Sequence, residues 1–222
     1  MARIARNSRT LSETDFSAPI DDRYFEDYQL GAVYEYGHLA VSEEAIIDFA
    51  EQFDPQPIHT DERFAATGPF NGLIASGWHS AGLAMRLFAD HYLSRVASLA
   101  SPGVDEVRWQ VPLRPGDSVR LRTTIVEARL SRSKDDRGMV VTLAELFNQN
   151  DQLPIRFRVM NILGRRPGSR DHFPSVTSRD RLDGTSASDL PGLSRLSMQQ
   201  RRCRLNAAGV FHWFERRSAT RL

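Results

Sequence analysis

Two side chains that could carry acid–base chemistry, Asp54 and His59, enclose the short stretch Pro-Gln-Pro-Ile. Because each proline fixes one backbone dihedral angle, this stretch is stiff and can hold a carboxylate and an imidazole at a defined separation. Such a pair can position a water molecule and move its proton. The same spacing also arises by chance, and Asp before Pro is common as a turn former. Residue types alone therefore leave two interpretations open, a catalytic pair and a simple turn.

A third candidate, Gly77, lies near the first turn of an expected helix. Backbone N–H groups are free at a helix start, the positive end of the helix dipole points outward there, and a glycine has no Cβ to block close approach. This is the layout of an oxyanion site for a carbonyl group. A nucleophile at His79 or Ser80 is the weaker interpretation, because no third orienting group is evident and polar residues near a helix start usually satisfy local hydrogen bonds.

Helical and strand patterns flank these residues. Residues 33–40 read as a strand, and Ser42 is a plausible N-cap for a helix that ends at Asp54, since the residue before a proline is pushed out of the helical region. A second helix is expected from about Ser76 to about Val96. Its first part is apolar nearly all round, so we expect it to be buried on most sides.

Runs of alternating apolar and polar residues follow, at about 107–111, 119–125, 139–147 and 154–163, with turn residues between them. No helical pattern separates them, which excludes a parallel, doubly wound sheet. The sequence therefore predicts a two-layer α+β domain, in which a curved antiparallel sheet packs on the long apolar helix. We expect Phe88 and Trp109 in its core.

Composition narrows the class of protein. The chain has 222 residues, a net charge of +1 and 41% hydrophobic residues, which is typical of a globular protein with one core. It lacks both an apolar run of membrane-spanning length and a secretory signal, so we expect no membrane partner. Cys203 is the single cysteine, which excludes an internal disulfide and a Cys-based zinc site. A cytoplasmic location is expected.

Charge is distributed unevenly along the chain. Residues 1–164 carry 17 basic and 23 acidic side chains, whereas residues 165–222 carry 12 Arg and only five acids. An acidic body argues against nucleic-acid binding, which needs clustered cations. We expect a flexible N-terminal arm over 1–22, the folded domain over 23–164, and an Arg/Ser-rich, disordered tail over 165–222.

The string from Phe49 to His79 resembles the signature of the MaoC-like dehydratases, a family that includes the R-specific enoyl-CoA hydratases. The resemblance in order and spacing extends over roughly residues 24–164. It implies a single domain with the hotdog fold, a long central helix wrapped by an antiparallel sheet, in agreement with the architecture expected above. Carried over by motif, it implies Asp54 and His59 as catalytic residues and Gly77 as the oxyanion site.

The resemblance also implies a reaction. Water is added across the double bond of a 2-enoyl thioester, or eliminated in reverse, with no metal and no redox cofactor. Coenzyme A is the expected carrier, acyl-carrier protein the other possibility, and a homodimer the expected assembly. We expect Gln56, Ser76 and Trp78 to contact the substrate. Many members have Asn and His where this chain has Gln56 and Ser76, which leaves the identity of the acyl group and the rate open.

Two other functions are compatible with the same fold. The first is an acyl-CoA thioesterase, in which a carboxylate activates water to attack the carbonyl carbon; the Asp54–His59 spacing speaks against it. The second is a non-catalytic acyl-binding partner subunit, which has no need of an acid–base pair. Arg114, Arg120 and Arg122 could meet the phosphates of coenzyme A, but a solvated face is the favoured interpretation on an alternating strand.

Overall fold

The computed structural model describes residues 8–169, 204–205 and 211–212. The chain divides into two units, Met1–Ser175 and Val176–Leu222. In the second unit, β7 (Arg204–Leu205) and β8 (Phe211–His212) pair antiparallel. The rest of the expected disordered tail from residue 170 onward lies outside the described residues. The following paragraphs concern the first unit.

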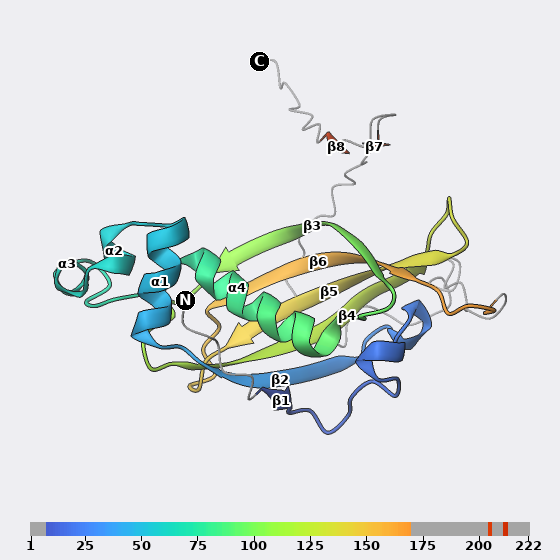
Figure 1. The fold of residues 1–222 in the computed structure, drawn as a ribbon, viewed down its shortest axis with the longest axis horizontal. Helices are drawn as coiled ribbons and strands as arrows, with labels where there is room; N and C mark the ends of the chain where they lie inside the picture. Colours follow the sequence, from blue (N-terminus) through green and yellow to red (C-terminus); the bar gives the residue numbers. More distant parts are fainter. Residues whose placement is uncertain (1–7, 170–203, 206–210, 213–222) are drawn as a thin grey trace, which may run out of the picture. The chain divides into compact units, whose positions relative to one another are not determined.

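The first unit contains a six-stranded antiparallel sheet (Figure 1). In spatial order its strands are β1 (Arg9–Thr10), β2 (Val33–Ala40), β4 (Ser118–Leu130), β5 (Arg137–Phe147), β6 (Ile155–Gly164) and β3 (Ser98–Trp109). The expected antiparallel α+β architecture is therefore confirmed. One boundary differs, since β3 begins well before the expected start near 107. It lies at the sheet edge with most side chains exposed, so it lacks the alternation that marks a strand with one buried face.

The first helix has the expected bounds. α1 (Glu43–Phe53) begins after Ser42, whose Oγ accepts a hydrogen bond from the Ala45 N–H at 3.1 Å. It ends where Asp54 leaves the helical region before Pro55. Two short helices, α2 (Pro57–Thr60) and α3 (Glu62–Ala66), follow, and Figure 1 shows all three at one end of the sheet.

The central helix lies across one face of the sheet (Figure 1). It consists of α4 (Gly77–Leu87) and a π-helical turn, η3 (Phe88–Tyr92), sixteen residues in all. It ends four residues before the expected end at Val96. A buried arginine binds the last two backbone carbonyl oxygens of the helix. The guanidinium of Arg23 donates to the carbonyl oxygens of His91 and Tyr92, at 2.8 and 2.9 Å.

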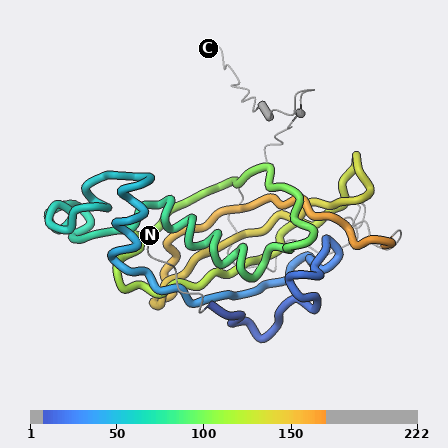
Figure 2. The backbone as a smooth tube through the Cα atoms, in the orientation of Figure 1, coloured from blue at the N-terminus to red at the C-terminus, as the bar shows by residue number. Residues whose placement is uncertain are grey.

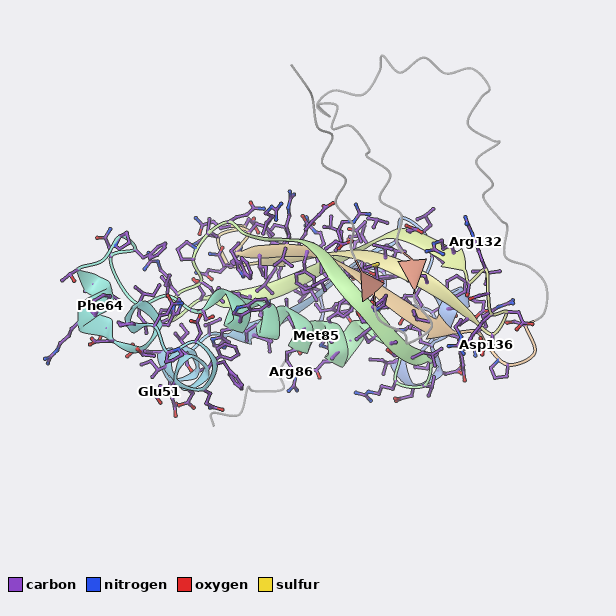
Figure 3. All side chains as sticks on the ribbon, turned by 90° about the horizontal axis from the view of Figure 1, so that it is seen from above. Glu51, Phe64, Met85, Arg86, Arg132 and Asp136 are labelled. Atoms are coloured by element: carbon purple, nitrogen blue, oxygen red, sulfur yellow. The ribbon has the colours of Figure 1, made fainter. Side chains whose placement is uncertain are left out.

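The expectation that this helix is buried on most sides is confirmed except along one exposed stripe. Leu83 and Leu87 are buried against the sheet, but Trp78, Gly82 and Met85 form an exposed face; Figure 3 labels Met85. Two of these exposed side chains, Trp78 and Met85, are large and apolar. No helix in the described part of the chain is both long and apolar enough to cross a bilayer.

The folded unit extends beyond the expected limits of 23–164. β1 pairs with β2, and the Phe16 ring stacks on Tyr34 at 4.2 Å beneath the guanidinium of Arg23. At the other end, Arg165 forms an ion pair with Glu26 at 3.0 Å. Residues 9–22 thus belong to the domain rather than to a flexible arm, and Figure 2 traces their path. A single aromatic among polar residues has no periodicity, so the sequence carried no signal for this contact.

Candidate active site

A pocket of about 420 Å³ contains all three predicted catalytic residues. Asp54 follows the last turn of α1, His59 lies in α2, and Gly77 is the first residue of α4. The pocket is closed on the other side by the end of β3 and the segment that leads to β4. Residues from four separate elements are thus brought to one cavity.

The two prolines build the local scaffold, as expected. Pro55 ends α1, and Pro57 occupies the first turn of α2, where its fixed φ suits the helix and its missing N–H is not needed. Between them, the Gln56 N–H donates to the Asp54 carbonyl oxygen at 2.7 Å. The tight turn leaves the Asp54 side chain 19% exposed and places His59, only 5% exposed, beside it.

The hydrogen bonding of His59 defines its tautomer. Its Nδ1 lies 2.8 Å from the carbonyl oxygen of Ile74, which can only accept, so Nδ1 carries the proton. In the neutral ring Nε2 is then an acceptor, and it faces Asp54 Oδ2 at 3.5 Å. Two acceptors facing one another can be joined by a molecule that donates to both, such as water. The geometry thus favours a water-binding position between these groups.

Asp54 is held as a carboxylate by two short hydrogen bonds. Ser76 Oγ donates to its Oδ2 at 2.6 Å, and Gln56 Nε2 donates to its Oδ1 at 2.6 Å. These hydrogen bonds hold the pKa of Asp54 below its ordinary value, and the one from Ser76 has the larger effect. Gln56 and Ser76, both expected to contact substrate, therefore bind the Asp54 carboxylate directly. The sequence could not show this, because 22 residues separate Ser76 from Asp54.

Replacing Ser76 with Ala should raise the pKa of Asp54 toward the ordinary value of about 4. The depressed pKa means that this hydrogen bond stabilises the fold above the ordinary Asp range, and the contribution is lost as pH falls through the depressed value. A carbon-13 NMR titration of the Asp54 carboxyl measures the shift. Ser76 also caps α4 through the Trp78 N–H, so the variant should lose about 1 kcal/mol of stability.

The matched control is Ser42→Ala, which removes the N-cap of α1 instead. It should lose a similar stability and leave the Asp54 titration unchanged. An unchanged titration in Ser76→Ala would contradict the stated cause of the pKa shift.

The oxyanion candidate, Gly77, packs against the indole of Trp109, for which the sequence-based prediction of a core position was wrong. Gly77 begins α4, and among the described residues none accepts a hydrogen bond from its N–H. Trp109, expected in the core, is 48% exposed at the end of the edge strand β3, and its Nε1–H donates to the Gly77 carbonyl oxygen at 2.9 Å. Its alternation with Val107 and Val111 imitates a core position, so sequence reasoning missed its place in the pocket wall.

Trp78 and Phe70 complete the aromatic part of the pocket wall. Trp78, expected to contact substrate, is 62% exposed and meets Trp109 edge to face at 5.5 Å. Phe70 was not predicted; its carbonyl oxygen accepts a 2.6 Å hydrogen bond from Arg114. Arg114 is therefore placed next to the pocket wall.

The two other arginines singled out in the sequence, both on β4, are engaged on the sheet instead. Arg120 and Arg122 form ion pairs with Glu35 of β2, at 3.4 and 2.6 Å. The expected solvated face fits Arg122, which is 39% exposed, better than Arg120, which is only 16% exposed. Among the described residues, no group of three or more His, Cys, Asp or Glu side chains could hold a metal ion.

His79 is buried beside the site rather than in it. It is 5% exposed and stacks on Phe49 with ring centroids 4.8 Å apart. Its Nδ1 is buried without a hydrogen-bond partner, and burial lowers its pKa to about 4. Ser80 lines the pocket, with its Oγ 3.4 Å from the Ser76 carbonyl oxygen. Neither has the orienting partner that a nucleophile needs.

The buried His79 predicts a loss of stability at mildly acidic pH. Its pKa is lowered on folding, so between the unfolded value of about 6.5 and the folded value of about 4 the unfolded chain binds a proton that the folded chain does not. The free energy of unfolding should fall by about 3 kcal/mol across this window. Urea unfolding at several pH values measures it. His79→Phe should remove most of this slope while keeping the stack on Phe49.

His38, an exposed histidine on β2, provides the control. His38→Gln should keep the wild-type slope. A wild-type slope in His79→Phe would show that other groups cause the acid sensitivity.

Residues 27–145 match the family model of the MaoC-like domain. The chain belongs to the MaoC-like dehydratase family. This is a family of hydratases and dehydratases that act on acyl thioesters. The chain is 30% identical over 127 residues to YdeM of Bacillus subtilis, an uncharacterised protein, covering 57% of this chain and 88% of YdeM.

A named dehydratase and two solved structures are also similar to this chain. A 3-hydroxybutyryl-CoA dehydratase of Methylorubrum extorquens is 33% identical over 111 residues, which is 47% of this chain and 64% of that enzyme. A solved MaoC-like dehydratase from Rhodospirillum rubrum is 35% identical, with a TM-score of 0.61 over 65% of this chain and 99% of that chain. A Mycobacterium tuberculosis protein with a double hotdog fold has a TM-score of 0.59 at 18% identity, over 78% of this chain and 54% of that protein. The hotdog fold of the MaoC-like domain is thereby confirmed.

Proposed function

We propose that this MaoC-like protein is a hydro-lyase that adds water to a 2-enoyl thioester or eliminates it from a 3-hydroxyacyl thioester. Coenzyme A is the proposed carrier. The observation that supports this most directly is the arrangement of Asp54 and His59 around a water-binding position, in the same pocket as the N–H of Gly77. The dehydratase among its relatives acts on a 3-hydroxybutyryl-CoA, which is a substrate of this class.

The geometry supports the following sequence of steps. A water molecule donates to His59 Nε2 and Asp54 Oδ2 and is thereby oriented toward the Cβ atom of the enoyl group. As the water oxygen bonds to Cβ, its proton passes to His59 Nε2. The electron pair of the double bond moves toward the thioester carbonyl, whose oxygen accepts a hydrogen bond from the Gly77 N–H. His59 then returns the proton to Cα, and the reverse steps eliminate water.

The two catalytic side chains have different roles in this scheme because their hydrogen bonding differs. The lowered pKa of Asp54 makes it a weak base, so it orients the water and stabilises the imidazolium that forms on His59. His59 is the proton carrier, because the Ile74 carbonyl oxygen leaves its Nε2 free to accept. In this scheme the proton that leaves the water molecule is the one added to Cα, so the reaction needs no other proton donor or acceptor.

The test follows the ultraviolet absorbance of the conjugated enoyl thioester with short and medium 2-enoyl-CoA substrates. Loss of this absorbance without release of free thiol supports the proposal, and the handedness of the 3-hydroxyacyl product can then be measured. Release of free thiol instead supports the thioesterase alternative. Binding of the substrates without either reaction supports a non-catalytic acyl-binding subunit. Each outcome separates one of the three functions from the other two.

We also propose a homodimer. The edge strand β3 exposes the apolar side chains of Leu99 and Val104, and the outer face of α4 exposes Met85; a second copy would cover them. The double hotdog protein joins two such units in one chain, and this chain covers 54% of it. Two copies of the present domain would reproduce that arrangement.

A further inference from the structure

The contact between Trp109 and Gly77 joins the end of β3 to the first turn of the central helix. The indole Nε1–H donates to the Gly77 carbonyl oxygen at 2.9 Å, although 32 residues separate them. The ring also lies directly over the Cα atom of Gly77. A Cβ atom built there would lie 2.6 Å from Trp109 Nε1 and 2.7 Å from Cε2.

This contact gives a physical reason for glycine at position 77. Gly77 lies in helical backbone, a conformation that any residue can adopt, so backbone freedom does not require a glycine there. The space that a side chain would need is filled by the indole. An alanine at 77 would push the ring away and stretch or break the Nε1–H bond to the Gly77 carbonyl oxygen, so the glycine and the tryptophan depend on one another.

The contact fixes the residue whose N–H is the proposed oxyanion donor. Hydrogen bonds within α4 order its interior, but the N–H groups of its first turn lack partners inside the helix. Trp109 adds a link from the sheet to Gly77 itself, and the edge-to-face packing of Trp78 gives the indole a second contact. An oxyanion donor stabilises the transition state only when it is fixed in the right direction beforehand.

We propose that Trp109 is a positioning residue for the reaction: it holds Gly77 so that its N–H faces the developing enolate oxygen. This inference rests on the proposed function. It gives Trp109 a part in the chemical step without contact to the reacting atoms. It also explains why position 77 is a glycine, because the indole of Trp109 leaves no room for a side chain there.

A double-mutant cycle tests the proposal through kcat, KM and Tm for 2-enoyl-CoA hydration. Trp109→Phe keeps a ring but loses the N–H, and should lower kcat about 10-fold with KM changed less than about twofold. Gly77→Ala should lower kcat about 100-fold when Trp109 is present. In a Trp109→Ala background, the same Gly77→Ala change should lower kcat less than about threefold, because the clashing ring is gone.

The Tm values follow the steric part of the argument independently of activity. Gly77→Ala should lower Tm when Trp109 is present and leave it nearly unchanged in the Trp109→Ala background. Val126→Ala, at an exposed position of β4 outside the pocket, is the control and should keep wild-type kcat.

The outcomes separate the two proposals. An active wild type in which Gly77→Ala lowers kcat equally in both backgrounds, or in which Trp109→Phe keeps full kcat, overturns the positioning role alone. A wild type without hydration activity overturns the proposed function, and the catalytic role of Trp109 with it. Rescue of Tm without rescue of kcat assigns the contact to stability only and also overturns the proposal.

Discussion

Asp54→Asn should lower kcat for 2-enoyl-CoA hydration by about 10³-fold while binding of the substrate persists. Asparagine keeps the shape of the side chain, and its amide can still meet Ser76 and Gln56. It cannot supply the negative charge that orients a water molecule and stabilises the imidazolium form of His59. An amide nitrogen turned toward Nε2 would also take the acceptor site that the water needs. The effect should therefore fall on kcat rather than on KM.

Enoyl-thioester absorbance and isothermal titration with a non-reactive acyl-CoA measure the two quantities. The matched control is Glu51→Gln, which neutralises an exposed carboxylate on α1, labelled in Figure 3. It should leave both unchanged. A wild-type kcat in Asp54→Asn would show that the Asp54 carboxylate has no part in the mechanism.

His59→Ala should lower kcat by about 10³-fold as well, because the proton carrier is lost. Two variants separate the chemistry from the fold. His59→Asn can still donate to the Ile74 carbonyl oxygen but has no group at the position of Nε2, so it should fold and remain inactive. His59→Ala leaves a space where the ring was, and added imidazole should restore part of its activity.

Steady-state kinetics with and without imidazole, with circular dichroism as the check on folding, measure these effects. His38→Asn, on the exposed side of β2, should behave as the wild type. A folded His59→Asn with wild-type kcat would refute the proposed role of His59. Restoration by imidazole in His59→Ala but not in His59→Asn would support it most directly.

The two substitutions together distinguish the candidate functions. A hydratase should lose its activity in both Asp54→Asn and His59→Ala, since the proposed mechanism needs both side chains, 3.5 Å apart, to hold the water. A thioesterase needs only one group to activate water toward the carbonyl carbon, so loss in a single variant combined with thiol release favours it. An acyl-binding subunit has no activity to lose, and both variants should bind substrate as the wild type does.

Local signals in the sequence were sufficient for much of the architecture. The Ser42 cap and the Asp54-Pro55 stop define α1 within its observed bounds, because a cap and a proline act over one helical turn. Alternating residues located β4, β5 and β6, whose inner faces are buried. The stiff stretch between Asp54 and His59 kept this pair together, since two prolines leave it few conformations.

Contacts between distant segments were decided only by the tertiary structure. The tautomer of His59 depends on the Ile74 carbonyl oxygen, and the lowered pKa of Asp54 depends first on Ser76; neither partner is near in sequence. Trp109 shows this most clearly. Alternation along a strand predicts which face of the sheet a side chain lies on, but not which residues it contacts there. Trp109, at the end of the edge strand β3, contacts Gly77 at the start of α4. This contact depends on how β3 and α4 pack together. Sequence periodicity is a local property, whereas the shape and chemistry of the pocket arise where separate elements meet.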